Sequence, residues 1–153
     1  MKNFLLSIMP LLSLFSVLLT GCEKVEMTIN KANPVPIVIA DKASDVERYA
    51  ARELKTYIRK ICGADCRIIN EKMAENTPAI YVGETEFAKN ANINFAAFGK
   101  EEWLLQTQNG NLILAGGKPR GTLYAVYEFL ENLGVVWTDE VTEFVPSLEN
   151  ILI

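Results

Sequence analysis

Hydrophobic and polar positions follow two different rhythms along the chain, and each predicts one kind of element. Residues 35–40 are β-branched and almost wholly apolar, which is typical of a short strand buried on both faces. Over residues 44–61 the apolar positions instead recur every three or four residues, which predicts an amphipathic helix. Ser44 and Glu47 form a capping box at the start of that helix, and Gly63 ends it.

The rest of the chain continues this pattern. Asn109-Gly110 separates two apolar segments and predicts an antiparallel hairpin, because both turn residues tolerate positive φ. A second amphipathic helix follows the glycine-rich segment 116–121 and ends at Gly134. Other short elements are predicted as strands at 66–70, 79–82 and 135–137 and as a helix at 84–91. Together they predict an α/β (α+β) fold, with one mixed β-sheet and two main helices packed on it.

The first 22 residues read as an export signal. Lys2 precedes an apolar run over residues 4–19, which is shorter than the roughly 20 residues that a membrane-spanning helix needs. The tetrad Leu19-Thr20-Gly21-Cys22 resembles the lipobox of bacterial lipoproteins, in which the cysteine sulfur receives a lipid. The resemblance implies that Cys22 is lipidated and that the mature protein lies in the bacterial cell envelope, anchored to a membrane outside the cytoplasm.

These signals predict three parts of the chain. Residues 1–21 are expected to be a lipoprotein signal peptide, and residues 34–150 a single folded domain. Between them, residues 22–33 mix Glu, Lys, Asn and Thr and have few apolar positions, so we expect a tether that holds the domain away from the bilayer.

Composition and charge exclude several kinds of function. The 15 Lys and Arg against 19 Asp and Glu give a net charge of -4, so no basic excess favours nucleic acid as a partner. The chain has no His, which excludes Ser-His-Asp and Cys-His catalysis as well as imidazole metal sites. We therefore expect no metal and no cofactor.

Cys62 and Cys66 remain once Cys22 carries a lipid. Export places them where disulfides persist, so the sequence leaves open a small structural disulfide or two inert thiols. Two thiols without further Cys or His cannot complete a tetrahedral zinc site. Their spacing also differs from the CxxC motif of redox enzymes, so no oxidoreductase role is predicted.

The glycine-rich segment before the second helix invites comparison with a phosphate-binding loop. Gly121 is followed by Thr122 and Leu123, so neither a Walker loop nor GxGxxG fits, and the glycines are expected to serve a tight turn and close packing. Arg120 is a candidate contact for an anion or glycan, although an arginine more often ties down a loop. Trp137 is the second candidate contact with glycan. Further aromatic residues considered for a sugar-stacking platform are Trp103, Tyr81 and Tyr124.

Carboxylate pairs are the remaining route to catalysis, since glycoside hydrolysis uses two carboxyl groups roughly 5 to 10 Å apart. No pair in the sequence lies in a context that suggests a hydrophobic pocket, so we expect solvated surface positions and name no catalytic residue. The pairs and groups considered are Glu101 with Glu102, Glu84 with Glu86, and Asp139 with Glu140 and Glu143.

Three segments resemble a known family. The segment LAGGKPRGTLYAVYEFLENLGVVWTDEVTEFVP, residues 114–146, resembles the end of the non-catalytic N-terminal domain of bacterial α-glucuronidases. ASDVERYAARELKTYIRKICGA, residues 43–64, resembles the first helix of that domain, and IYVGET, residues 80–85, its central strand and the following turn. The resemblance implies an α/β domain similar to the second domain of β-N-acetylhexosaminidases.

In such enzymes this domain precedes a (β/α)8 barrel that carries the catalytic carboxylates. The sequence ends at Ile153, where a barrel would begin, so no catalytic position can be carried over. The resemblance implies an accessory domain for carbohydrate degradation, with carbohydrate and a separately encoded glycosidase barrel as expected partners. A surface glycan-binding module and an inactive fragment of a glycosidase are the alternatives.

Overall fold

The computed structural model describes residues 27–75, 78–139 and 142–153. The predicted signal peptide, 1–21, and Cys22 lie outside the described residues. In chain order the elements are β1 (Thr28–Ile29), β2 (Ile37–Ile39), α1 (Asp45–Cys62), β3 (Ile68–Asn70), β4 (Ile80–Val82), α2 (Glu86–Asn90), β5 (Trp103–Gln108), β6 (Asn111–Gly116), α3 (Gly121–Asn132), β7 (Val136–Trp137), β8 (Glu143–Phe144) and β9 (Ile151–Leu152). Within these ranges, no helix has both the length and the apolar character needed to cross a membrane.

The main sheet is mixed, as the sequence predicts. Its strand order is β3-β2-β4-β6-β5, in which the first four strands are parallel and β5 runs antiparallel to β6. Tyr81 of the central strand β4 lies opposite Val38 of β2 and Ile113 of β6. The predicted hairpin is confirmed at Asn109-Gly110, where both residues have positive φ.

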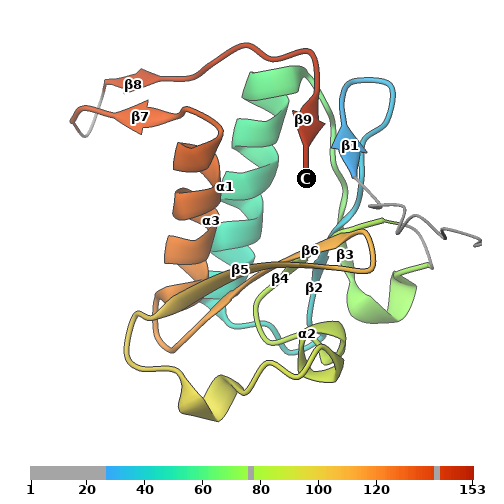
Figure 1. Ribbon diagram of the computed structural model, residues 1–153, viewed down its shortest axis with the longest axis vertical. Coiled ribbons are helices and arrows are strands. Elements are labelled where there is room, and N and C mark those ends of the chain that lie inside the picture. Colours follow the sequence, from blue (N-terminus) through green and yellow to red (C-terminus); the bar gives the residue numbers. More distant parts are fainter. Residues whose placement is uncertain (1–26, 76–77, 140–141) are drawn as a thin grey trace, which may run out of the picture.

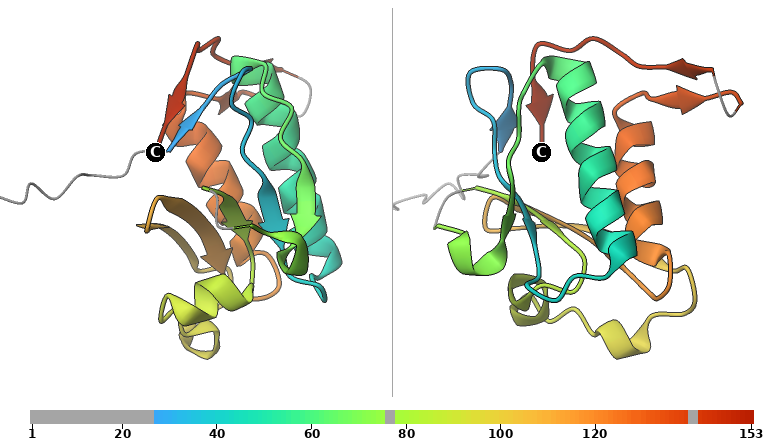
Figure 2. Two further views of the ribbon diagram at one scale, coloured as in Figure 1. Left: turned by 90° about the vertical axis from the view of Figure 1, so that its right-hand side faces the viewer. Right: turned by 180° about the vertical axis from the view of Figure 1, so that it is seen from behind.

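Helices cover the sheet unequally. The two long helices, α1 and α3, lie together on one face, and α2 with the loop after it lies on the other (Figures 1 and 2). Because successive strand residues point to opposite faces, Ile37 and Ile39 pack beneath the long helices while Val38 packs on the α2 side. All three are buried, which explains the uniformly apolar strand pattern.

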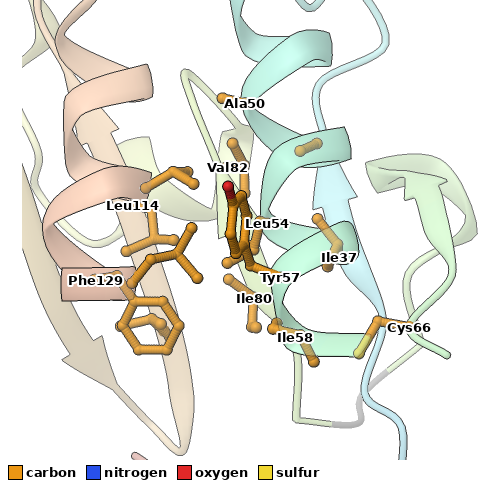
Figure 3. Packing of buried hydrophobic residues seen from close by; sticks show 14 of the residues in the cluster. Ile37, Ala50, Leu54, Tyr57, Ile58, Cys66, Ile80, Val82, Leu114 and Phe129 are labelled. Carbon is orange, nitrogen blue, oxygen red and sulfur yellow. The ribbon is translucent and has the colours of Figure 1, made fainter. Parts of the chain in front are cut away.

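The larger core lies between α1, α3 and the sheet. Leu54 and Ile58 of α1 are fully buried there, beside Ile37 and Ile80 of the sheet (Figure 3). Burying each such side chain contributes about 1.5–3 kcal/mol. On α3, Val126 and Leu130 are buried in this core, and Leu123, Tyr127 and Leu133 are half-buried and pack against it.

The predicted boundaries of α1 are confirmed. Ser44 and Glu47 form both hydrogen bonds of the capping box, and Gly63 follows the helix in the left-handed region at φ 73°. Acidic residues lie in the first turn and basic residues in the last turn, so both ends also complement the helix dipole.

The predicted tether is wrong for its described part, residues 27–33. Met27 and Ile29 are buried in the larger core, and β1 pairs antiparallel with β9 near the other end of the chain. No local pattern predicts the burial of these apolar side chains, because their partner strand lies more than a hundred residues away. The folded unit accordingly extends on both sides of the predicted 34–150 boundary, from Met27 to Ile153.

Candidate functional site

The carboxyl ends of β2, β4 and β6 meet at one edge of the sheet, and a hollow lies there. The chain leaves β2 and β6 toward the long helices but leaves β4 toward α2 on the opposite face. Such a divergence is where open α/β sheets bind ligands. A pocket of about 400 Å³ occupies this place, and its lining includes Ser44, Glu47, Glu84, Phe95, Phe98, Lys100, Gly117, Lys118 and Thr122.

Glu47 closes the floor of this edge pocket. One carboxylate oxygen accepts hydrogen bonds from the Ser44 amide at 2.7 Å and the Ser44 hydroxyl at 2.9 Å. The other oxygen accepts from the Glu84 amide at 2.9 Å, on the loop after β4. Glu47 is the one buried acidic residue among those described, and both its oxygens serve to join two loops. It is therefore a structural carboxylate.

Charged side chains at the pocket rim neutralise one another. The Glu84 carboxylate lies 3.1 Å from the Lys118 ammonium and 3.5 Å from that of Lys89. Hydrogen bonding from Lys118, followed by the charge of both lysines, lowers the pKa of Glu84 from its ordinary value. Glu84 is thus a stable anion near neutral pH and is unsuited to act as a general acid.

The glycine-rich segment before α3 is explained by close packing. A Cβ on Gly116 would lie 2.3 Å from the Gly121 carbonyl carbon, and one on Gly117 would lie 2.0 Å from the Gly99 carbonyl oxygen. Neither position has room for a side chain. The sequence prediction that these glycines serve a tight turn and helix packing is confirmed.

Arg120 and Trp137, the two candidate glycan contacts, do not form one site. Arg120 lies at the start of α3, whereas Trp137 lies in β7 after its end. At 1.5 Å per residue, the 12-residue helix alone separates them by about 18 Å. Arg120 instead pairs with Glu101 and lies over the ring of Tyr124, with its guanidinium carbon 5.7 Å from the ring centroid.

Trp137 belongs to an aromatic cluster that fastens β7 to the long helices. Its indole N–H donates to the Tyr57 hydroxyl at 2.8 Å, and its ring makes edge contacts with Tyr57 and Tyr127 at centroid distances of 5.4 and 5.2 Å. The Tyr57 hydroxyl in turn donates to Glu143, which also pairs with Lys60. With its indole N–H used internally and its ring half-buried, Trp137 has a packing role.

Glu143 is exposed, as predicted for this carboxylate, but it lies in strand β8 and joins that strand to α1. Hydrogen bonds from Lys60 and Tyr57 lower the pKa of Glu143. Burial and the bond to Glu143 raise the pKa of Tyr57. No local signal in the sequence indicates this contact, because 83 residues separate Lys60 from Glu143.

Trp103 is the exposed member of the predicted aromatic set. It begins the edge strand β5, with 47% of its surface accessible, and its ring meets Tyr124 edge-on at a centroid distance of 6.3 Å. Tyr81, by contrast, is buried and stacks on Phe87 at 4.0 Å. The structure therefore brings together Trp103, Tyr124 and Arg120, and excludes Tyr81 and Trp137 from that group.

Cys62 and Cys66 are free thiols, so the disulfide alternative is not formed in the structure. Cys62 donates to the Ile58 carbonyl, as a cysteine in a helix commonly does, at 3.4 Å. Cys66 is fully buried, and burial raises the pKa of its thiol to about 11. A buried thiol that remains protonated is a poor nucleophile. Within the described ranges, no group of three or more Cys, Asp or Glu side chains is arranged to hold a metal ion.

Residues 22–129 match the family described as glycosyl hydrolase family 67 N-terminus. Among solved structures, a family GH115 4-O-methyl-α-glucuronidase, BtGH115A, with specificity for decorated arabinogalactans, is similar with a TM-score of 0.63 and 23% identity. The match covers 81% of this chain and 17% of that one, so the likeness concerns one domain of a much longer protein. No curated protein matches the chain.

Proposed function

The chain belongs to the glycosyl hydrolase family 67 N-terminus family, and on that premise we propose that it serves carbohydrate degradation as an exported, lipid-anchored accessory domain that does not itself cleave glycosidic bonds. The observation that carries the accessory role is the family match, which spans residues 22–129 and so most of the folded domain. The lipid anchor rests on the lipobox-like tetrad at residues 19–22. The solved relative acts on decorated arabinogalactans, and these make the first polysaccharides to test.

The state of the carboxylates supports an accessory role. Glycoside hydrolysis needs one carboxylic acid with a raised pKa beside a second carboxylate. Both carboxylate oxygens of Glu47 accept hydrogen bonds from loop amides, and the pKa values of Glu84 and Glu143 are lowered. None of these three side chains is in the state that a general acid requires.

An exposed apolar pair supports a protein partner. Val136 and Phe144 lie opposite each other on β7 and β8 and expose 50% and 63% of their surfaces. Adjacent large apolar side chains on a surface favour association with another protein. We assign this surface to a separately encoded glycosidase barrel, whose active site would supply the cleaving carboxylates.

The catalytic part of the proposal is tested by hydrolysis assays. The full-length chain, purified in detergent, is expected to release no sugar from glucuronosyl or hexosaminyl glycosides or from decorated arabinogalactan. Adding a glycosidase barrel protein encoded by a neighbouring gene should give turnover, and Phe144→Ala should weaken the pairing of the two proteins. Turnover by the chain alone that is lost on substitution of one carboxylate would contradict the proposal.

The anchor is tested separately. Cys22→Ser should abolish incorporation of labelled palmitate and move the protein from the membrane fraction to the soluble fraction. Cys62→Ser is the matched control and should leave both unchanged. Unaltered labelling of the Cys22→Ser protein would show that the lipid, if any, lies elsewhere.

A further inference from the structure

One exposed group of side chains remains unused by the accessory role. We call it the Trp103 platform, and it consists of Glu101, Trp103, Arg120 and Tyr124. β5 passes beside the first turn of α3 (Figure 1), which brings the two halves of the platform together although they are 17 or more residues apart in sequence. The Trp103 ring is half exposed at the edge of the sheet, and no other strand covers it in the described structure.

The platform is held in place by its surroundings. Trp103 lies opposite Gly116 on β6, and because Gly116 has no side chain, the backbone of α3 approaches closely enough for Tyr124 to meet Trp103. Arg120 is fixed from two sides, by Tyr124 and by Glu101, which accepts from the Arg120 Nε at 2.9 Å. A rigid aromatic surface loses little conformational entropy when a ligand binds to it.

Glu101 adds an independent sign of specialisation. Its backbone lies in the left-handed region at φ 65°, which is uncommon for a residue with a side chain. Residues in such sparsely populated backbone regions cluster at active sites and ligand clamps. Here the conformation accompanies the ion pair between the Glu101 carboxylate and Arg120. The guanidinium of Arg120 in turn lies over the ring of Tyr124, which contacts Trp103.

We propose that the Trp103 platform binds a neutral pyranose unit of a polysaccharide. A pyranose ring has one face of C–H bonds, which carry partial positive charge and pack against the electron-rich face of an indole. Its equatorial hydroxyls need hydrogen-bonding partners at the rim, and Arg120 and Glu101 supply donors and acceptors there.

The net charge of the Trp103 platform favours a neutral sugar over an acidic one. The positive charge of Arg120 is offset by the Glu101 carboxylate, so the platform has no net formal charge with which to attract a uronate. An acidic sugar would have to break that pair or approach the Glu101 carboxylate. Binding to the neutral main chain of a polysaccharide would hold the domain on its substrate. This binding role goes beyond the accessory role and does not depend on the barrel.

Calorimetric titration of the full-length chain in detergent with xylohexaose, cellohexaose and mannohexaose tests the proposal. At least one of these neutral oligosaccharides is expected to bind, with an affinity that is unchanged between low and high salt. Trp103→Ala should weaken binding by about tenfold or more, as removal of a stacking side chain does, whereas Trp103→Phe should keep most of it. Met73→Ala, at an apolar residue that is 69% exposed and follows β3 at the opposite edge of the sheet from β5, is the control and should bind like the wild type.

Three results would overturn the proposal. One is the absence of binding to all three oligosaccharides at millimolar concentration, with circular dichroism showing a folded protein. Another is binding that the Trp103→Ala protein retains in full. The third is strong preference for an acidic oligosaccharide such as hexagalacturonate, lost at high salt. None of these outcomes bears on lipidation or on the barrel, so the proposed function stands or fails separately.

Discussion

At the scale of single residues, the edge of the sheet depends on one carboxylate and one glycine. Glu47 accepts three hydrogen bonds from two loops, and Gly83 leaves room for it. A Cβ on Gly83 would lie 2.2 Å from a Glu47 oxygen, and the backbone there has φ +85°. Gly83 is therefore required for two reasons, its conformation and the contact with Glu47.

Comparing Gly83→Ala with Gly134→Ala separates these reasons. Gly134 also has positive φ, at +97°, but its nearest neighbour would be 3.6 Å from a new Cβ. Gly134→Ala should cost about 1–2 kcal/mol of unfolding free energy for the left-handed backbone. Gly83→Ala should cost about 1–3 kcal/mol more, because a displaced Glu47 carboxylate no longer accepts from the part-buried amides of Ser44 and Glu84. Urea unfolding measures both, and equal losses would show that the Glu47 contact contributes nothing.

At the scale of elements, the β7–β8 pair is attached to the long helices by polar contacts at its end. Glu143 of β8 joins Tyr57 and Lys60 of α1, and Trp137 of β7 lies against Tyr57 and Tyr127. This attachment presents Val136 and Phe144 to solvent. The presentation of the proposed barrel-binding surface therefore depends on the charge of Glu143.

Stability at low pH tests this attachment. The pKa of Glu143 is lowered below its ordinary value of 4.5, so its contribution is complete above about pH 4.5 and is lost as the pH falls through the lower, folded-state value. The wild type should therefore lose more thermal stability between pH 6 and pH 3 than Glu143→Gln does. Glu149→Gln, at an exposed carboxylate, is the control and should follow the wild type. Equal losses of thermal stability in the wild type and Glu143→Gln would contradict a stabilising role for the Glu143 carboxylate.

At the scale of the whole molecule, the two ends of the described chain close the fold. β1 and β9 pair at residues 28–29 and 151–152, and Met27 exchanges backbone hydrogen bonds with Ile153. Ile29 and Ile151 are both buried in the larger core (Figure 1 shows β1 and β9 side by side). The segment before β2 is thus part of the domain's stability.

Truncating one buried and one exposed side chain of the β1–β9 pair measures how much this pair contributes to the free energy of unfolding. Ile29→Ala should lower the unfolding free energy by about 2–5 kcal/mol, since Ile29 is completely buried. Leu152→Ala, at a position on β9 that is 64% exposed, should change it by no more than about 0.5 kcal/mol. If Ile29→Ala unfolded no more easily than Leu152→Ala, β1 would be a tether after all.

The amino-acid sequence by itself determined the elements that rest on neighbouring residues. The capping box at Ser44 and the turn at Asn109-Gly110 need only a few adjacent positions, and both are present as predicted. The mixed sheet with two long helices also follows from local periodicity, because each amphipathic element has one apolar face to bury.

Only the tertiary structure decided which side chains meet. Glu143 reaches α1, Ile29 reaches β9, and Trp103 rather than Trp137 joins Arg120 and Tyr124, each across a long separation in sequence. The hydrophobic pattern of a sequence predicts whether a residue is buried or exposed, but it does not predict which distant residue it contacts. Those contacts depend on how strands are ordered and helices packed, and that arrangement distinguishes a packing tryptophan from one available to a ligand.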